Sequence, residues 1–144
     1  GSGGTYLYMP AGGSRRPASH ETVEKRMHYV HQDGKSVFKF AVRLMADVSA
    51  ELLNRNGFGP ADVKLYVPHQ ANLRIINAAR ERLNLREDQV AVNIDRYANT
   101  TSATIPSCLA EAQACGKLSK GDLVVLASFG AGFTWGSVLL RWGI

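Results

Sequence analysis

The run Leu123-Val124-Val125-Leu126-Ala127 constrains the fold of this chain more than any other feature of its sequence. Five consecutive apolar residues have the length of a β-strand, and no polar residue alternates with them to face water. Strands of this composition are typical of a sheet that helices cover on both faces. The run therefore predicts an α/β fold.

The sequence around this strand alternates between helical and strand-like patterns. Apolar residues at helical spacing predict three helices, over residues 37–52, 71–83 and 104–115. Short runs rich in residues that favour β-strands predict two earlier strands, over residues 64–67 and 90–94. Residues 133–142 form a last strand, which a Gly-rich turn makes antiparallel to its predecessor. The expected order is βαβαββ, which is a mixed sheet with helices on its faces.

Residues 1–35 differ from this pattern, because they are rich in Pro and Gly and contain three of the four histidines. One apolar alternation, over residues 6–9, is compatible with a short strand, and the remainder is expected to be irregular. More than about thirty irregular residues before a compact body are unusual for a free-standing domain. We therefore expect residues 1–35 to be a lead-in segment, compatible with a preceding strand outside the chain, and residues 36–144 to be one domain of a larger fold.

The composition excludes several classes of function. The 144 residues include 17 Lys and Arg against 12 Asp and Glu, and this net charge of +5 is too small and too dispersed to indicate nucleic acid binding. No apolar run approaches the ~18 residues of a membrane-spanning helix, and the N-terminus does not resemble a secretory signal. The two cysteines, Cys108 and Cys115, suit neither a disulfide framework nor a metal site. We expect a cytoplasmic protein with no metal, no cofactor, and no membrane or nucleic acid partner.

Basic residues are concentrated in one place, within the predicted helix over residues 71–83 and just beyond it. Four arginines lie there against the single carboxylate of Glu81, and they are Arg74, Arg80, Arg82 and Arg86. Such a cluster suits an acidic partner, but a solvated helix face explains it equally well.

Polar side chains and glycines follow the strands, in loops over residues 68–72, 97–102 and 128–133. Because ligands bind beyond the carboxyl ends of strands in such sheets, we expect these loops to bring His69, Asn99 and a Gly-rich backbone to one place. The His69 Nε2 and the Asn99 amide would donate hydrogen bonds to one oxygen, and backbone N–H groups of the last loop would donate to another. This arrangement would stabilise negative charge on carbonyl oxygens.

Each of these features also has a purely structural explanation. A single histidine after a strand is more often a capping or core residue than a catalytic one, and a tight turn explains the glycines. The position of Cys115 at a helix C-terminus disfavours a thiolate. Cys108 lies near a helix start and is the better nucleophile of the two, although a small buried apolar role is more common for such a residue.

Three motifs taken together are far more specific than any one of them. They are H-Q-A-N at residues 69–72, N-T-T-S-A-T-I-P at residues 99–106 and F-G-A-G-F-T-W-G at residues 129–136. In this order they closely resemble the C-terminal half of the β-ketoacyl-acyl carrier protein synthase III family, which belongs to the thiolase-like superfamily. The resemblance covers nearly the whole chain. It implies a three-layer α/β/α arrangement in which two halves of a longer protein form one active site.

The resemblance also implies an activity. Members of the family initiate fatty acid synthesis by a decarboxylative Claisen condensation between an acyl-CoA primer and malonyl-acyl carrier protein. Their nucleophilic cysteine lies in the N-terminal half, and neither cysteine here matches it. The His and Asn of the family's Cys-His-Asn triad match His69 and Asn99, which would hold the malonyl thioester and stabilise its enolate. This chain alone is therefore expected to be inactive, with exposed apolar surface where the other half would pack, such as parts of residues 37–53 and the strand of residues 133–142.

Further residues acquire roles from the same resemblance. Phe129 matches an aromatic residue beside the triad, and the backbone N–H of Ala131 matches an oxyanion donor, although many members have Gly there. Asn72 matches a residue of the substrate tunnel. The basic residues that would dock the acidic acyl carrier protein are Arg74, which matches the family, and the neighbouring Arg80 and Arg82. The other implied partners are the acyl-CoA, the N-terminal half of the enzyme and a second copy in a homodimer.

Four interpretations remain compatible with the sequence. The chain is the C-terminal half of a synthase III, a related thiolase-like condensing enzyme of secondary metabolism, a carrier-protein-binding module without catalysis, or a hydrolase that uses Cys108 with His69. The three motifs in order favour the first interpretation.

Overall fold

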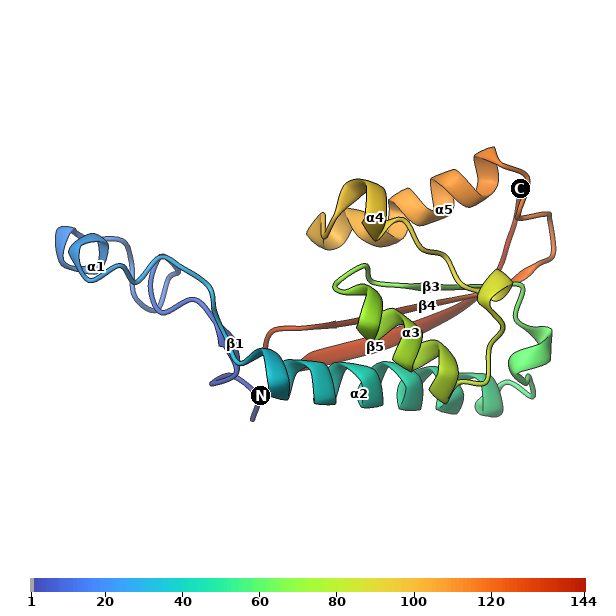
Figure 1. Ribbon diagram of the computed structural model, residues 1–144, viewed down its shortest axis with the longest axis horizontal. Coiled ribbons are helices and arrows are strands. Elements are labelled where there is room, and N and C mark those ends of the chain that lie inside the picture. Colours follow the sequence, from blue (N-terminus) through green and yellow to red (C-terminus); the bar gives the residue numbers. More distant parts are fainter. Residues whose placement is uncertain (1) are drawn as a thin grey trace. The chain divides into compact units, whose positions relative to one another are not determined.

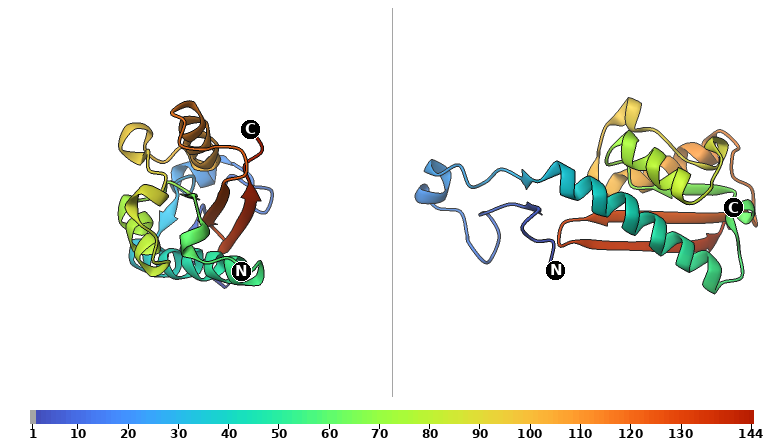
Figure 2. Two further views of the ribbon diagram at one scale, coloured as in Figure 1. Left: turned by 90° about the vertical axis from the view of Figure 1, so that its right-hand side faces the viewer. Right: turned by 60° about the horizontal axis from the view of Figure 1, so that its bottom comes forward.

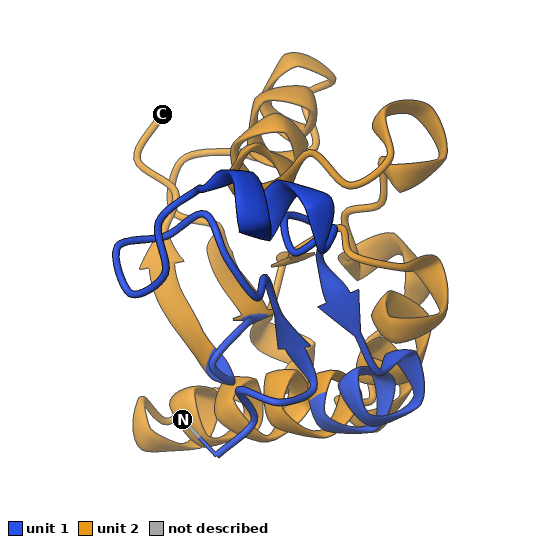
Figure 3. Ribbon diagram, turned by 90° about the vertical axis from the view of Figure 1, so that its left-hand side faces the viewer, with its two compact units in different colours: residues 1–40, 130–134 blue, residues 41–129, 135–144 orange. Residues whose placement is uncertain are grey.

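A three-stranded sheet in the order β3-β4-β5 organises the larger of two compact units (Figures 1 and 3). The computed structural model describes residues 2–144. The larger unit contains Ala41–Phe129 and Trp135–Ile144. The smaller unit contains the chain up to Phe40 together with Gly130–Thr134. The candidate catalytic residues His69 and Asn99 therefore both belong to the larger unit.

Two parallel strands carry the sheet. β3 (Leu65–Pro68) pairs with β4 (Leu123–Gly130), so that Leu65 lies opposite Val124. All of β3 and the first three residues of β4 are buried, which confirms that the apolar run forms a strand covered on both faces. β5 (Thr134–Arg141) lies beside β4 and runs antiparallel to it, as its Gly-rich turn predicted (Figure 1).

Helices cover both faces of this sheet, with α2 and α3 on one side and α4 and α5 on the other (Figures 1 and 2). Their bounds are Gly34–Arg55 for α2, Leu73–Arg82 for α3, Ile94–Tyr97 for α4 and Thr104–Ala114 for α5. The three predicted helices are confirmed to within a few residues, whereas the short α4 was not predicted. The fold is α/β, with a mixed sheet that ends in an antiparallel strand.

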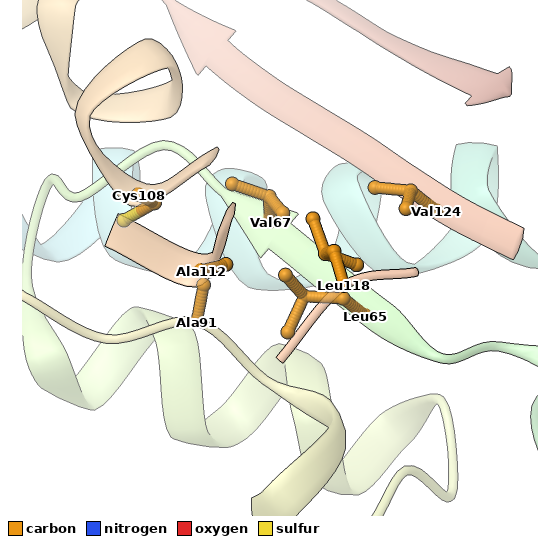
Figure 4. Packing of buried hydrophobic residues seen from close by; sticks show 7 residues of the cluster. All are labelled: Leu65, Val67, Ala91, Cys108, Ala112, Leu118 and Val124. Carbon is orange, nitrogen blue, oxygen red and sulfur yellow. The ribbon is translucent and has the colours of Figure 1, made fainter. Parts of the chain in front are cut away.

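A cluster of buried apolar residues joins β3 and β4 to α5 (Figure 4). Its members are Leu65, Val67, Ala91, Cys108, Ala112, Leu118 and Val124. Cys108 and Ala112 are one helical turn apart, so they place a single face of α5 against the sheet. This packing fixes the start of α5, which follows the loop that carries Asn99.

Short 3-10 helices connect these elements. Their bounds are Pro60–Asp62 for η1, Glu87–Gln89 for η2 and Thr101–Ala103 for η3. The buried Gln89 amide donates to the carbonyl oxygens of Pro60 and Val63, so that η2 is held against η1. η3 runs directly into α5, and it therefore sets how the chain enters that helix.

The smaller unit contains the predicted lead-in of residues 1–35. In it β1 (Leu7–Tyr8) pairs antiparallel with β2 (His31–Gln32), and α1 (His20–Glu24) lies between them in the sequence. β1 falls within the expected strand of residues 6–9. The sequence did not predict β2 and α1, because elements of two and five residues are too short to show a period.

An aromatic cluster packs within the smaller unit. The Tyr6 ring stacks on Phe133 with ring centroids 5.8 Å apart, and the Phe40 ring lies 5.3 Å from the Phe133 ring. Gly3 approaches Phe133 so closely that a Cβ atom at this position would collide with the ring. Glycine is therefore required at residue 3 by space rather than by backbone conformation.

The predicted strand over residues 90–94 is wrong. Val90 makes a single parallel bridge to Tyr66, and the chain then leaves the sheet before α4 begins at Ile94. The run was apolar and β-branched enough to indicate a strand, and it does pack against the sheet through Val90 and Ala91, which are buried. The Val90 and Ala91 N–H groups donate to the backbone carbonyls of Glu87 and Tyr66, whereas a side chain pairs with the next backbone groups, the Ala91 carbonyl and the Asn93 N–H.

That side chain is the buried amide of Gln70. Its Nε2 donates to the carbonyl oxygens of Pro68 at 2.7 Å and Ala91 at 3.2 Å, and its Oε1 accepts from the backbone N–H of Asn93 at 3.0 Å. Buried backbone groups need such partners when no neighbouring strand provides them. Gln70 therefore replaces the ladder of a further strand and fixes the segment that leads to α4.

The last strand exposes apolar side chains, as expected. Trp135 and Val138 of β5 are 49% and 53% exposed, and because they are three residues apart they lie on opposite faces of the strand. The expectation for residues 37–53 is wrong, because the large apolar side chains of that stretch are buried or half-buried. Part of this stretch is tied to β5, since the Ser137 hydroxyl donates to the Val48 carbonyl at 3.0 Å.

Within the described chain, no helix is both long enough and apolar enough to cross a membrane.

Replacing Gln70 by leucine is expected to destabilise the protein by about 2–4 kcal/mol, because it leaves several buried backbone groups without a partner. Thermal unfolding followed by circular dichroism measures the change. The matched control is Gln32→Leu, at an exposed position of β2. A Gln70→Leu protein as stable as this control would show that the amide does not hold the segment.

Candidate active site

The end of β3 places His69. Its backbone N–H donates to the carbonyl of Ala127 at 2.8 Å, which extends the pairing with β4 by one residue beyond Pro68. The imidazole is half-buried, and its Nδ1 lies 2.6 Å from the Thr104 hydroxyl oxygen. Burial lowers the pKa of His69 below the ordinary histidine value, so the ring is neutral at neutral pH. Both the backbone and one ring nitrogen of His69 are therefore fixed.

Asn99 lies on a loop with an unusual backbone. The flanking residues Ala98 and Thr101 have φ angles of 58° and 55°, in the left-handed region that non-glycine residues rarely occupy. The Asn99 Oδ1 accepts a hydrogen bond from the Thr101 backbone N–H at 2.9 Å. Because the amide oxygen is held in this turn, the amide NH2 group points away from it and is presented as a donor on the exposed side of the loop.

A chain of hydrogen bonds connects the two predicted catalytic residues. The Thr101 backbone N–H contacts Asn99, the Thr101 carbonyl oxygen lies 2.9 Å from the Thr104 hydroxyl, and that hydroxyl contacts His69. These contacts connect the two loops through Thr101 and Thr104. That His69 Nε2 and the Asn99 amide donate to one oxygen stays a prediction. The sequence analysis did not identify Thr104. A neutral histidine that donates from one ring nitrogen needs a partner at the other, and this requirement could have indicated such a residue.

Glu111 of α5 supports this loop from the other end. Its carboxylate accepts hydrogen bonds from Asn93 Nδ2 at 3.1 Å, from an Arg96 Nη at 2.7 Å and from the Tyr97 hydroxyl at 3.0 Å. Asn93 immediately precedes α4, and the other two residues lie on it. Glu111 therefore ties α4 to α5, and the strained loop spans the short distance between these helices. Nothing in the local sequence pattern indicated this role.

Asn72 has a clear structural role. It is the N-cap of α3, and its side-chain oxygen accepts from the Arg74 backbone N–H at 2.9 Å. Capping of this kind contributes about 1 kcal/mol to a helix. Asn72 and Arg74 are both exposed at the start of α3, a few residues after His69. This position is compatible with a surface next to the site. The helix-capping role of Asn72 is observed, and its role in a substrate tunnel stays a prediction.

The other predicted docking arginines are engaged by carboxylates. The Arg82 guanidinium donates twice to Asp47, at 2.9 and 3.1 Å. Arg80 has a side chain only 20% exposed, and it contacts Glu81 at 3.2 Å and the Leu85 carbonyl at 3.4 Å. Exposed ion pairs of this kind are weak, but they partly neutralise the charge that a partner would meet.

The third predicted loop lies at the end of β4. Phe129 is buried and belongs to the larger unit, whereas Ala131 is exposed and belongs to the smaller one. The Ala131 carbonyl accepts from the Thr134 hydroxyl at 3.0 Å, which closes the turn. Gly132 has a φ of 135°, and a Cβ atom there would lie 2.9 Å from a Thr134 methyl group, so the turn requires glycine.

Neither cysteine has the environment of a nucleophile. Cys108 lies in the apolar cluster beneath α5, and burial, with a contribution from Glu111, raises the pKa of its thiol to about 11 (Figure 4). Cys115 is exposed at the end of α5. The structure therefore removes the basis for a hydrolase that pairs Cys108 with His69. Within residues 2–144, no group of three or more His, Cys, Asp or Glu side chains could hold a metal ion.

Comparisons with known proteins found similar sequences and similar structures. The sequence model described as "3-Oxoacyl-[acyl-carrier-protein (ACP)] synthase III C terminal" matches residues 53–142. A curated β-ketoacyl-[acyl-carrier-protein] synthase III from Solibacter usitatus is 58% identical over 142 residues, which are 99% of this chain and 43% of that protein. The protein of the same name from Chlorobium phaeobacteroides is 55% identical over 141 residues, with shares of 98% and 43%. This chain thus spans less than half the length of these curated relatives.

Solved structures give the same result. The synthase III from Thermus thermophilus superposes with a TM-score of 0.85 at 45% identity, over 99% of this chain and 43% of that one. The synthase III from Pseudomonas aeruginosa gives a TM-score of 0.86 at 39% identity, with shares of 98% and 42%. The priming β-ketosynthase of the R1128 polyketide pathway is more distant, with a TM-score of 0.80 at 30% identity over 98% of this chain and 42% of that one.

The burial of Cys108 leads to a simple prediction for thiol chemistry. An alkylating reagent added to the folded protein should modify Cys115 and leave Cys108 unmodified, because the Cys115 thiol is exposed and the Cys108 thiol is buried. Peptide mass spectrometry after labelling identifies each site, and labelling in denaturant, where both should react, is the control. Rapid modification of Cys108 in the folded protein would restore it as a candidate nucleophile.

Proposed function

This chain belongs to the 3-oxoacyl-[acyl-carrier-protein] synthase III family, and we propose that it provides the His and Asn half of a condensing active site. The complete protein would join an acyl-CoA primer to malonyl-acyl carrier protein and so begin fatty acid synthesis. The observation that carries the proposal is a chain of contacts from Asn99 to His69. The Thr101 backbone N–H donates to Asn99, the Thr101 carbonyl accepts the Thr104 backbone N–H, and the Thr104 hydroxyl lies against His69 Nδ1. These contacts would orient two uncharged hydrogen-bond donors, the His69 imidazole and the Asn99 amide, from two different loops. Such donors can stabilise an enolate.

The first half-reaction is acyl transfer to a cysteine in the other half of the protein. The cysteine sulfur attacks the thioester carbonyl of the acyl-CoA, the carbon–sulfur bond to CoA breaks, and the CoA thiolate leaves with the cysteine's proton. Cys108 and Cys115 do not serve here, because one thiol is buried with a raised pKa and the other lies at the far end of α5. For this reason the chain by itself would form no acyl-enzyme.

The second half-reaction is decarboxylation of the malonyl thioester. The thioester oxygen would accept hydrogen bonds from His69 Nε2–H and from the Asn99 amide. As the bond to the carboxylate breaks and carbon dioxide leaves, its electron pair forms an enolate whose charge lies largely on that oxygen. Each preorganised donor contributes on the order of 3–4 kcal/mol to such a transition state. The lowered pKa of His69 supports a neutral donor here.

The enolate carbon then attacks the acyl-cysteine. A carbon–carbon bond forms, the carbon–sulfur bond to the cysteine breaks, and the thiolate is regenerated. We assign the backbone N–H of Ala131 to the oxyanion of this tetrahedral intermediate, and the buried Phe129 to the wall beside the triad. These two assignments rest on the motif of residues 129–136 and remain predictions.

The partners follow from the same proposal. Acyl carrier protein is acidic, and Arg74, at the exposed start of α3, would meet it close to His69. Arg80 and Arg82 lie further along the same helix, where they pair with Glu81 and Asp47. The N-terminal half of the protein would cover the apolar surface of β5, the complete enzyme would form a homodimer, and its unpaired cysteines suit a cytoplasmic location.

A related condensing enzyme of secondary metabolism is the second candidate. The likeness to a polyketide priming ketosynthase favours it. The sequence identity to that protein, however, is lower than the identity to the curated β-ketoacyl-[acyl-carrier-protein] synthase III of Solibacter usitatus. The same His and Asn chemistry serves both candidates, so primer preference separates them. Acylation of the complete protein by a panel of acyl-CoA thioesters, followed by mass spectrometry, measures that preference.

Replacing His69 or Asn99 by alanine in the complete protein should leave acyl-cysteine formation intact and slow malonyl decarboxylation by about 10²–10³-fold. Asn99→Asp should be at least as damaging, because a carboxylate places negative charge against the developing enolate. Mass spectrometry of the acyl-enzyme and release of carbon dioxide measure the two steps separately.

The isolated 144-residue chain is the negative control, and it should form no product. If acylation collapsed while decarboxylation survived, the assigned roles would be reversed, and His69 would act mainly as the base for the cysteine.

Replacing Arg74 by glutamate should raise the KM for malonyl-acyl carrier protein roughly tenfold, because it places like charge against an acidic carrier. The effect should shrink at high salt, and acylation from a CoA thioester should change little. Arg55→Glu makes the same charge change at the far end of α2 and is the matched control. An equal fall in both half-reactions would mean that Arg74 holds the active site together.

A further inference from the structure

We propose that the Thr104 hydroxyl donates its proton to Nδ1 of His69 and so fixes the ring in the tautomer that carries its hydrogen on Nε2. Thr104 is thereby a positioning residue, because it acts on the reaction only through the histidine. The inference rests on the proposed function, in which Nε2 must donate to the thioester oxygen, and it names the residue that makes this possible.

The hydroxyl has two contacts and one proton. Thr104 is buried at the first residue of α5, with its Oγ1 2.6 Å from His69 Nδ1 and 2.9 Å from the Thr101 carbonyl oxygen. If the proton points to the carbonyl, Nδ1 must carry a hydrogen and donate to Oγ1, which leaves Nε2 as an acceptor. If the proton points to Nδ1, the neutral ring carries its hydrogen on Nε2.

The Thr101 carbonyl does not need the hydroxyl. It already accepts the backbone N–H of Thr104, which closes the 3-10 turn of η3. Nδ1 of His69 has no such second partner within residues 2–144, since the Thr104 hydroxyl is the one group hydrogen-bonded to it. Donation to Nδ1 therefore satisfies the ring without leaving the Thr101 carbonyl unpaired.

The surroundings hold Thr104 in place for this contact. Its side chain is β-branched and buried, and its own carbonyl accepts the Ser107 hydroxyl at 2.9 Å. The packing of α5 on β3 and the link from Glu111 to α4 fix both ends of the loop that leads to it. The contact joins residues 35 positions apart, so it exists only when the loop and β3 are both in their folded positions.

The direct test is the tautomer of His69 in the complete protein. The nitrogen NMR chemical shifts of a labelled imidazole separate a protonated from a bare ring nitrogen, and the His69→Gln protein assigns the signals. We expect a neutral ring with hydrogen on Nε2 in the wild type and in Thr104→Ser, which keeps the hydroxyl. Thr104→Val, which keeps the shape and removes the hydroxyl, should lose this preference.

The kinetic counterpart uses the same variants. Thr104→Val should lower the kcat of malonyl decarboxylation by roughly 10- to 100-fold, with little change in KM or in acyl-cysteine formation, and Thr104→Ser should restore it. Thr100→Val, which removes a hydroxyl one residue before η3, is the matched control and should change neither measurement.

Two results would overturn the inference. One is a wild-type ring with its hydrogen on Nδ1, which would show that the hydroxyl donates to Thr101 and that Nε2 is set as a base. The other is a Thr104→Val protein that decarboxylates at the wild-type rate. Failure of the proposed function would give another result. The complete wild-type protein would then not condense its substrates, whichever nitrogen of His69 carries the hydrogen. If Thr104→Val did not fold, the wild-type spectrum would still decide.

Discussion

The parallel pairing of β3 with β4 is the interaction on which the rest of this structure depends. All of β3 and the first three residues of β4 are buried, so their register is fixed by apolar side chains that have no alternative position in water. The pairing continues by one hydrogen bond past Pro68, from the His69 N–H to Ala127. The backbone of the candidate catalytic histidine is thus attached to the buried sheet rather than to a free loop.

Side-chain amides and hydroxyls then transmit that position to the neighbouring loops. Gln70, one residue after His69, ties the end of β3 to Ala91 and Asn93, and Thr104 ties His69 to the loop of Asn99. Each of these groups is buried and partnered, so a shift of one loop would leave the others with unpaired polar atoms. The two candidate donors are therefore positioned together, although their segments are about thirty residues apart in the sequence.

Much of this arrangement could be predicted from the sequence, because it depends on periodicity and on strand ends. The buried run at residues 123–127, the three longest helices and the position of His69 at the end of a strand follow from such local patterns. The predicted strand over residues 90–94 was wrong because composition does not reveal that Gln70 would take its hydrogen bonds. Thr104 and Glu111 were missed for the same reason, since their partners lie far away in the sequence.

The loop of Asn99 shows why these distant contacts matter for the chemistry. Ala98 and Thr101 occupy left-handed conformations that cost of order 1–3 kcal/mol each, so the loop would relax if it were free. Glu111 holds one side of it through α4, and the Thr104 backbone N–H holds the other by donating to the Thr101 carbonyl at the start of α5. Their hydrogen bonds offset the strain before any substrate binds. A donor held in this way does not need to reorganise when charge develops on the thioester oxygen, and a preorganised donor is worth more to the reaction than one that must be ordered during it.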